Sequence, residues 1–160
     1  CVSLYAAKGA VVSWIHFADL SNSDLRGMLV WIKEAGASAT SYPNGFINET
    51  EAVGSRYAAP TGQGKAINLS AAAVNFSGGT IASAFNNAVS VNAGSQVVNL
   101  SPNAMTLTIS TASGAFTGQV TEPGVGTVRK FGGVVLQKQN AGFGCTSGTA
   151  TSSRVIFAAP

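Results

Sequence analysis

The feature that most constrains the fold of this chain is an alternation of apolar and polar residues with a period of two. In the stretch "MTLTIST", Met105, Leu107 and Ile109 fall on one side, and threonines and a serine fall on the other. Successive side chains of a strand point to opposite faces, so this pattern indicates a strand with one buried face. Helical periodicity is almost absent, and the best helical candidate, around residues 35–40, is short and uncapped. The alternation therefore predicts an all-β chain.

Glycine and proline mark the points where these strands reverse. The apolar positions change from odd to even numbers between Ile109 and Phe116, and Ser113-Gly114 lies between them, which predicts a hairpin. Pro123-Gly124 suits the two central positions of a type II turn, because proline fixes a negative φ and glycine accepts a positive one.

The C-terminal part of the chain predicts one long strand and two shorter ones. The long strand covers about residues 125–139 and ends in "VVLQKQ", which would emerge from the core. Asn140-Ala141-Gly142 would be its turn. Residues 143–147 and 153–157 would form the last two strands.

The first half of the chain has the same character. "VVSWIHFA" and "RGMLVWIK" are apolar on both faces, so both are expected to be covered on both sides, with "SNSD" as their connection and "SYPNGF" as a later turn. Short strands with Gly, Asn and Pro between them predict a single-domain antiparallel β-barrel or β-sandwich over residues 1–160. The strands expected in the middle lie in "AINLS", "AVNFSGG", "AVSVNAGS" and "QVVNLSPN".

Charge excludes several classes of partner. Charged residues make up 9 % of the chain, against about 25 % in ordinary soluble domains. The basic residues are scattered, and only Arg129 and Lys130 are adjacent. Binding to nucleic acid depends on clustered cations, so no nucleic-acid partner is expected. No run of about 18 apolar residues is present, so no membrane-spanning helix is expected either.

The two cysteines, Cys1 and Cys145, leave three interpretations open. An even count in a chain rich in Gly, Ser and Thr favours a disulfide formed in an oxidising compartment. A first residue that is cysteine, without an initiator methionine or signal peptide, also fits a lipid anchor at Cys1, which would leave Cys145 unpaired. The third interpretation is two unpaired buried thiols.

No catalytic constellation is present in the sequence. His16 is the only histidine; Asp19 and Asp24 lie near it, but no serine sits in a strained elbow, so we interpret His16 as a strand residue. Glu49 and Glu51 share one side of a strand and read as a solvated face. No metal-ligand spacing or phosphate-binding loop is found. We therefore predict no catalytic residues, no metal, no cofactor and no enzyme activity.

Aromatic residues offer one further possibility, because they can stack on sugars. Trp14 and Trp31 lie in strands that are apolar on both faces, which favours a packing role. Tyr42 and Tyr57 flank turns, and they are the candidate glycan contacts.

The stretch "GGVVLQKQNAGFG" carries a resemblance. Together with "LRGMLVWIK", "YPNGF", "VGSRY", "VNFSGG" and "SGAFTGQV", in this order from Val11 to Phe157, it resembles a β-rich module at the C-terminal ends of large, repetitive bacterial surface or secreted proteins. The chain departs from that pattern at Cys145-Thr146, where the family has aromatic residues. The resemblance implies an extracellular or cell-surface location and no catalytic residues, and the departure favours a special role for Cys145, such as pairing with Cys1.

These observations lead to one expected function and one alternative. The expected function is a non-catalytic structural or adhesive module outside the cytoplasm, which associates with itself or with neighbouring β modules in a surface assembly or filament. Because charges usually guard the edges of sheets and this chain has few, strand addition or face packing is the expected mode. The alternative is a β-barrel that binds a small ligand or a glycan.

Overall fold

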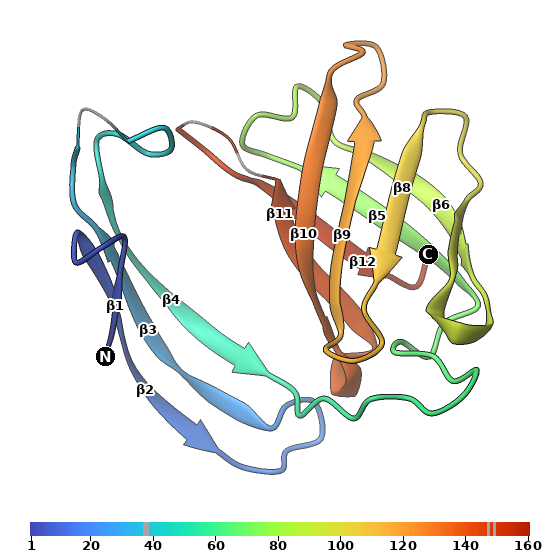
Figure 1. Ribbon diagram of the computed structural model, residues 1–160, viewed down its shortest axis with the longest axis horizontal. Coiled ribbons are helices and arrows are strands. Elements are labelled where there is room, and N and C mark those ends of the chain that lie inside the picture. Colours follow the sequence, from blue (N-terminus) through green and yellow to red (C-terminus); the bar gives the residue numbers. More distant parts are fainter. Residues whose placement is uncertain (37–38, 147, 149) are drawn as a thin grey trace. The chain divides into compact units, whose positions relative to one another are not determined.

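The computed structural model describes residues 1–36, 39–146, 148 and 150–160 (Figure 1). Strands dominate it and all pair antiparallel, so the predicted all-β class is confirmed. The chain divides into two compact units, Cys1–Arg56 and Tyr57–Pro160, called here the N-terminal and the C-terminal unit. Each unit is described by itself, and the single domain expected over residues 1–160 stays a prediction.

The N-terminal unit is a four-stranded meander in which each strand pairs with the next along the chain. The segment "SNSD" connects the second and third strands, as predicted. There, the Leu20 amide donates to the Ser23 carbonyl (2.9 Å) and the Ala18 amide to the Asp24 carbonyl (3.1 Å). The strands are β1 (Val2–Leu4), β2 (Gly9–Phe17), β3 (Leu25–Lys33) and β4 (Phe46–Gly54).

The loop before β4 contains both a confirmed turn and the helical candidate. In "SYPNGF", Tyr42 and Gly45 adopt positive φ values of 51° and 66°, and β4 begins at the next residue. Of the helical candidate around residues 35–40, residues 37 and 38 lie outside the described residues. The described residues on either side have no helical structure, so the helix is not confirmed.

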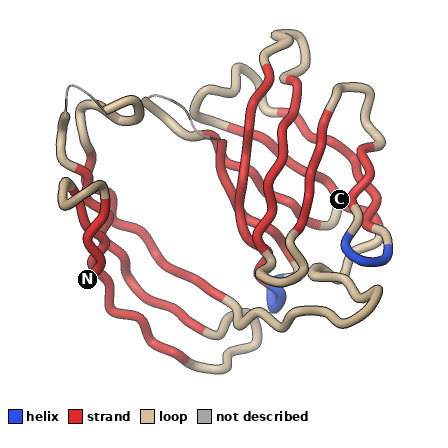
Figure 2. Tube along the Cα trace, in the orientation of Figure 1, coloured by secondary structure: helices blue, strands red, loops and turns tan. Residues whose placement is uncertain are grey.

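The C-terminal unit is an eight-stranded sheet that curls into a nearly closed barrel (Figures 1 and 2). Its spatial order is β7-β6-β5-β12-β11-β10-β9-β8. Two short 3₁₀ turns, η1 (Ala93–Ser95) and η2 (Gln137–Gln139), are the helical segments visible in Figure 2. The strands are β5 (Ala71–Ser77), β6 (Phe85–Val91), β7 (Val97–Asn99), β8 (Met105–Ile109), β9 (Ala115–Thr121), β10 (Val128–Leu136), β11 (Ala141–Thr146) and β12 (Ser153–Ala158).

The alternating stretch and its two turns are confirmed. Met105, Leu107 and Ile109 are buried in β8, with exposures of 9, 6 and 8 %, while the residues between them are exposed. The hairpin to β9 places Ile109 opposite the buried Phe116. At the next reversal Gly124 has a φ of 75°, and the Val125 amide lies 3.3 Å from the Glu122 carbonyl, as in a type II turn.

The end of β10 differs from the prediction. The strand ends at Leu136, and Gln137–Gln139 form the turn η2 instead of the last part of the strand. Asn140 completes the reversal in the left-handed region with a φ of 49°, and β11 already begins at Ala141. The segment "AINLS", expected as a strand, also has no strand structure.

The Gln137 side chain explains this difference. Its amide group hydrogen-bonds to the backbone of residues 58–66, as a neighbouring strand would. Its Oε1 accepts from the Ala58 amide (2.8 Å), and its Nε2 donates to the carbonyls of Ala58 (3.0 Å) and Ala66 (3.1 Å). One side chain therefore holds two separate points of the incoming chain.

Asn140 makes the same kind of pair with Asn68. Its Oδ1 accepts from the Asn68 amide (2.8 Å), and its Nδ2 donates to the Asn68 carbonyl (3.1 Å). Between these attachment points, Ile67 is only 1 % exposed and packs into the core. We call Gln137 and Asn140 the amide clamp. It fixes residues 58–68 without a strand ladder, which is why "AINLS" is ordered but is not a strand.

We expect Gln137→Met to lower the free energy of unfolding of the C-terminal unit by about 2 kcal/mol, because it removes three hydrogen bonds and leaves backbone groups of the clamped segment unpaired. Urea unfolding followed by far-ultraviolet circular dichroism would measure the effect. Gln119→Met is the matched control, since Gln119 is exposed on β9 and should change stability by less than about 0.5 kcal/mol. Equal effects of the two substitutions would contradict a clamping role for Gln137.

A network of asparagines links β6 and β7, at one end of the C-terminal sheet, to the end of β9. Asn87, fully buried on β6, donates to Oδ1 of Asn99 (2.9 Å) and of Asn103 (3.0 Å). Asn103 in turn donates to the Asn87 side chain (3.0 Å) and to the Thr121 carbonyl at the end of β9 (3.1 Å). This network joins β6 and β7 to β9 across the position where the barrel would otherwise remain open.

Aromatic rings fill the barrel interior. Phe76 and Phe131 pack edge to face with ring centroids 5.2 Å apart, and Phe116 lies 6.3 Å from Phe157. Each of these rings is at most 5 % exposed. The interior of the barrel is therefore filled by side chains of the C-terminal unit itself.

Candidate functional site

The carboxylates and the histidine considered for catalysis lie apart from any enclosed site. His16 is exposed on β2, and Glu49 and Glu51 are exposed on β4. Oε1 of Glu51 lies 3.4 Å from Nε of Arg26, with both side chains about half exposed. An exposed ion pair of this kind contributes little to stability. Among the described residues, no group of three His, Cys, Asp or Glu side chains could hold a metal ion.

The two aspartates near His16 have structural surroundings. Oδ2 of Asp24 accepts from the Arg56 amide at 2.6 Å, and the Asp24 amide donates to the Gly54 carbonyl at 2.8 Å. These contacts hold the chain where it leaves β4. Asp19, in the connection between β2 and β3, is exposed.

Glu122 is a buried carboxylate that sequence reasoning missed. It is 1 % exposed, and its Oε1 accepts from the Ala82 amide at 2.7 Å. Its Oε2 lies 3.0 Å from Nε and 2.9 Å from an Nη of Arg129, which also donates to the Thr80 carbonyl (3.0 Å). The Ala82 hydrogen bond is the largest cause that lowers the pKa of Glu122; Arg129 adds to it, and burial opposes both. All these partners are structural, so Glu122 and Arg129 fasten the segment before β6 to the barrel.

The parity of β9 is the signal that could have located Glu122. Phe116 and Val120 are even-numbered and point into the core, and continuing the same alternation places Glu122 on the buried side. A carboxylate at a buried strand position requires a cation. Arg129, at the start of the next strand of the hairpin, supplies it.

The candidate glycan contacts are both partly buried. Tyr57 packs against the core and donates its hydroxyl to the Thr111 carbonyl at 2.6 Å. Burial raises the pKa of Tyr57 above its usual value of 10.0. Tyr42 packs edge to face against Phe46, with ring centroids 5.2 Å apart. A glycan role for either tyrosine stays a prediction.

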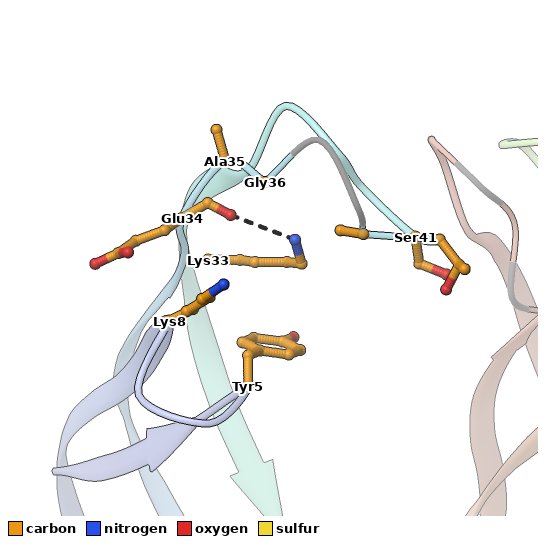
Figure 3. Close-up of a pocket in the computed structure, with 9 residues that line it drawn as sticks. Tyr5, Lys8, Lys33, Glu34, Ala35, Gly36 and Ser41 are labelled. Carbon is orange, nitrogen blue, oxygen red and sulfur yellow. Dashed lines mark hydrogen bonds between the residues drawn. The ribbon is translucent and has the colours of Figure 1, made fainter.

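A surface hollow of about 370 Å³ lies at one end of the N-terminal sheet (Figure 3). Tyr5 and Lys8 come from the turn between β1 and β2, and Lys33 ends β3. Nζ of Lys33 donates to the carbonyls of Tyr42 (3.0 Å) and Glu34 (3.3 Å) and lies 5.7 Å from the centroid of the Tyr5 ring. The Lys33 ammonium group therefore joins the turn between β1 and β2 to the loop after β3. This charged group of the hollow thus has a structural role.

The N-terminal sheet itself is the most unusual surface of the molecule. All buried hydrophobic side chains of the described chain lie at Ala66 or later, so the N-terminal unit has none. The expectation that "VVSWIHFA" and "RGMLVWIK" are covered on both sides is wrong within their own unit, because the described part of this unit has a single layer of strands. A sheet normally buries at least one face against another layer.

One face of this sheet, which we call the Trp14 face, exposes large apolar side chains beside a few charged ones. Trp14 is 91 % exposed, Ile47 77 % and Met28 57 %. The strand registers align Trp14 with Met28 and Glu51, and Val12 with Val30 and Glu49. The Trp14 face consists of Ala10, Val12, Trp14, His16, Arg26, Met28, Val30, Ile32, Ile47, Glu49, Glu51 and Val53.

The opposite face carries apolar side chains as well. Ile15, Leu29 and Trp31 lie on it, and Trp31 packs against Phe46 with ring centroids 5.3 Å apart. Phe17 on the same face is 75 % exposed. Both faces of a single sheet therefore present apolar surface, and surface of this extent usually marks an interaction site.

The predicted disulfide is not formed. Cys1 and Cys145 are both free, and both are exposed, so the interpretation as buried thiols is wrong as well. Each unit contains one cysteine: Cys1 precedes β1, and Cys145 lies in β11 opposite Gly132 and Arg154. Neither thiol thus has a bonding partner in its own unit. A lipid anchor at Cys1 stays a prediction.

Within the part of the chain that is described, no helix has the length and apolar character needed to cross a bilayer. The candidate site with the clearest physical basis is thus the exposed N-terminal sheet, because the titratable groups considered above have structural surroundings or lie exposed on the surface outside any enclosed site. No protein-family model matches the chain, and neither a curated protein nor a solved structure is significantly similar to it.

Proposed function

We propose that this protein is a non-catalytic structural or adhesive module outside the cytoplasm, which associates through its N-terminal sheet with a second copy of itself in a larger surface assembly. The observation that carries this proposal is the absence of buried hydrophobic side chains among the described residues of a unit whose two faces are both apolar. The resemblance to β-rich modules of bacterial surface proteins supports the location.

The energetic argument begins with the size of the exposed side chains. An aromatic residue such as Trp14 buries about 150–250 Å² when it is covered. At about 25 cal/mol per Å² this corresponds to about 4–6 kcal/mol. Trp14 is 91 % exposed in the isolated chain, so nearly all of this contribution is available to a partner.

The dimensions of the sheet suit a dimer. Three strands of nine residues at about 3.3 Å per residue give a length of about 30 Å. With about 4.8 Å between strands and β1 at the edge, one face covers about 450 Å² in projection. Protruding side chains make the accessible area of this face larger than its projected area. A standard stable interface buries about 800 Å² of accessible area per partner.

The test is the oligomeric state of the full chain, measured by sedimentation equilibrium over a wide concentration range. We expect an oligomer that Met28→Lys dissociates, with a dissociation constant raised at least about tenfold, because it replaces an exposed apolar side chain at the centre of the face with a charged group whose desolvation opposes association. Met28 lies opposite Glu51, so the new lysine is compatible with the sheet itself. Val134→Lys, at a half-exposed position of the C-terminal unit, is the control and should leave the oligomer unchanged. A wild-type chain that stays monomeric at every concentration would contradict the proposal.

A second candidate function, glycan binding, is favoured by one observation. The indole of Trp14 is almost completely exposed on the sheet, and an exposed aromatic ring is a stacking surface for a sugar. We expect titration calorimetry with soluble oligosaccharides to detect binding that Trp14→Ala abolishes and Trp31→Ala retains, if this is the function. Binding that persists in Trp14→Ala would contradict a sugar site on the Trp14 face.

A further inference from the structure

The hollow at the end of the N-terminal sheet is surrounded by strained backbone. Tyr5, Ala6 and Ala7, in the turn between β1 and β2, have consecutive positive φ values of 55°, 53° and 69°. Tyr42, whose carbonyl accepts from Lys33, has a φ of 51°. Positive φ values are uncommon outside glycine, and least expected for bulky residues. Because such backbone clusters at ligand-binding and active sites, its position here points to a site.

The hollow presents positive charge without a counter-charge. Lys8 and Lys33 both line it, and among the described residues neither forms an ion pair. Glu34 is the acid among the described lining residues. Figure 3 shows its carboxylate pointing away from Ser41, whereas the ammonium nitrogens of both lysines lie toward the hollow. An anionic group is therefore the complementary ligand.

Both lysines are held in place before a ligand arrives. The Lys8 amide donates to the Tyr5 carbonyl (3.2 Å), and the Lys8 carbonyl accepts from the Glu34 amide (2.9 Å). Nζ of Lys33 is fixed by the carbonyls of Tyr42 and Glu34. An ammonium group has three donors, so one donor of Lys33 remains for a ligand. Groups that are already ordered lose less entropy on binding.

The other lining groups indicate the class of ligand. Thr40 and Ser41 bring hydroxyl groups, which both donate and accept hydrogen bonds, and Tyr5 brings an aromatic ring. The volume of about 370 Å³ falls at the lower end of the range of about 300–1,000 Å³ for small-molecule sites. This space exceeds that of a single inorganic ion. A ring that carries both a carboxylate and hydroxyl groups matches the size and the chemistry.

We propose that this hollow binds an acidic sugar, with its carboxylate between the ammonium groups of Lys8 and Lys33 and its hydroxyl groups on Thr40 and Ser41. The proposal goes beyond the proposed function and does not depend on it, because the described lining residues all belong to one N-terminal unit. Tyr42, a candidate glycan contact, has an indirect part here, since its carbonyl holds the Lys33 ammonium group.

Titration calorimetry of the full chain with D-glucuronate tests the site, with D-glucose as the neutral probe. We expect glucuronate to bind and glucose to bind at least about tenfold more weakly, because glucose lacks the carboxylate that the lysines would hold. Lys8→Met removes one charge and keeps an unbranched side chain. It should weaken glucuronate binding at least about tenfold, because a hydrogen bond between charged groups is lost.

Lys130→Met is the matched control for Lys8→Met. Lys130 is exposed on β10 of the C-terminal unit, so the same change in net charge should leave glucuronate binding as it is. An equal loss in both variants would show attraction to net charge alone and would overturn the proposal. Circular dichroism would verify that both variants keep their strands.

Inorganic phosphate distinguishes a sugar site from a plain anion site. We expect it to bind at least about tenfold more weakly than glucuronate, because phosphate has no sugar hydroxyl groups to place on Thr40 and Ser41. Phosphate binding as tight as that of glucuronate would contradict the sugar assignment. Glucuronate binding that Trp14→Ala abolishes would place the ligand on the Trp14 face instead and would also overturn the proposal.

The oligomer measurement separates this inference from the proposed function. Met28 does not line the hollow, so Met28→Lys should dissociate the oligomer and retain glucuronate binding. Lys8→Met should do the reverse. If glucuronate does not bind to the wild-type chain, this inference is wrong and the proposed function stands.

Discussion

Replacing Glu122 with alanine is expected to lower the free energy of unfolding of the C-terminal unit by about 3–5 kcal/mol, the usual cost of removing one partner from a buried ion pair. The substitution leaves the Ala82 amide without its acceptor and removes the carboxylate beside Arg129, whose side chain is only 26 % exposed. It also frees the segment that Glu122 and Arg129 hold to the barrel. Urea unfolding at neutral pH would measure the loss.

The exposed ion pair of the N-terminal unit provides the control. Glu51→Ala removes the partner of Arg26, and because both side chains are about half exposed, the expected change is at most about 1 kcal/mol. If Glu51→Ala destabilises the chain as much as Glu122→Ala does, then burial is not the reason for the large contribution of the Glu122–Arg129 pair to stability.

Glu122 also makes the stability of the barrel dependent on pH. Its pKa in the folded chain lies below the usual value of 4.5, so the unfolded chain binds a proton more readily than the folded one. This contribution to stability is complete above pH 4.5 and is lost as the pH falls through the lower, folded pKa. We expect Glu122→Gln to be less stable than wild type at neutral pH and to lose less stability on acidification. A parallel acid response of both proteins would contradict this assignment.

The second large effect is expected at Gly133, the inner member of the glycine pair that begins "GGVV". A Cβ atom added at Gly133 would lie about 2.5 Å from Cζ of the buried Phe116 ring and would also meet the Phe143 carbonyl. Neither neighbour can move without disturbing the core or the strand ladder. We expect Gly133→Ala to lower the free energy of unfolding by about 3 kcal/mol, near the upper end of ordinary overpacking effects.

Gly132 is the matched control for Gly133. Its added Cβ would lie 3.4 Å from the Phe116 carbonyl and 3.8 Å from Cγ2 of Thr117, which are ordinary contacts. Gly132→Ala is therefore expected to be neutral or to stabilise the chain by up to about 1 kcal/mol, because alanine restricts the unfolded state. Thermal unfolding of the two variants side by side would show the contrast, and equal melting temperatures would contradict the packing argument.

Local sequence patterns are sufficient to predict a strand where that strand has one buried face. The alternation of β8 and the positive φ of Gly124 depend on residues close together in the sequence, and both were predicted. The end of β10 depends instead on hydrogen bonds from Gln137 to Ala58 and Ala66, more than 70 residues away. No local pattern contains such contacts, so the strand was extended too far.

The candidate site shows the same limit in another form. The apolar character of "VVSWIHFA" was visible in the sequence, and it was interpreted as burial on both sides. The hydrophobicity of a strand predicts that its faces are buried against other residues. It does not show whether those residues belong to the same unit or to another molecule. Trp14, 91 % exposed, shows that here they do not belong to the same unit. Glu122 could have been located by parity, whereas the partners of Asn87 could not.

The amide clamp has a mechanical consequence for the attachment of the chain to the barrel. The N-terminal unit ends at Arg56, and the chain is fastened to the barrel directly afterwards, by the Tyr57 hydroxyl at Thr111 and by Gln137 and Asn140 at residues 58–68. A pulling force transmitted from the first unit would reach these bonds before it reached any strand ladder of the barrel. The tension would be shared among several short polar contacts, and the barrel would keep its shape while they yielded.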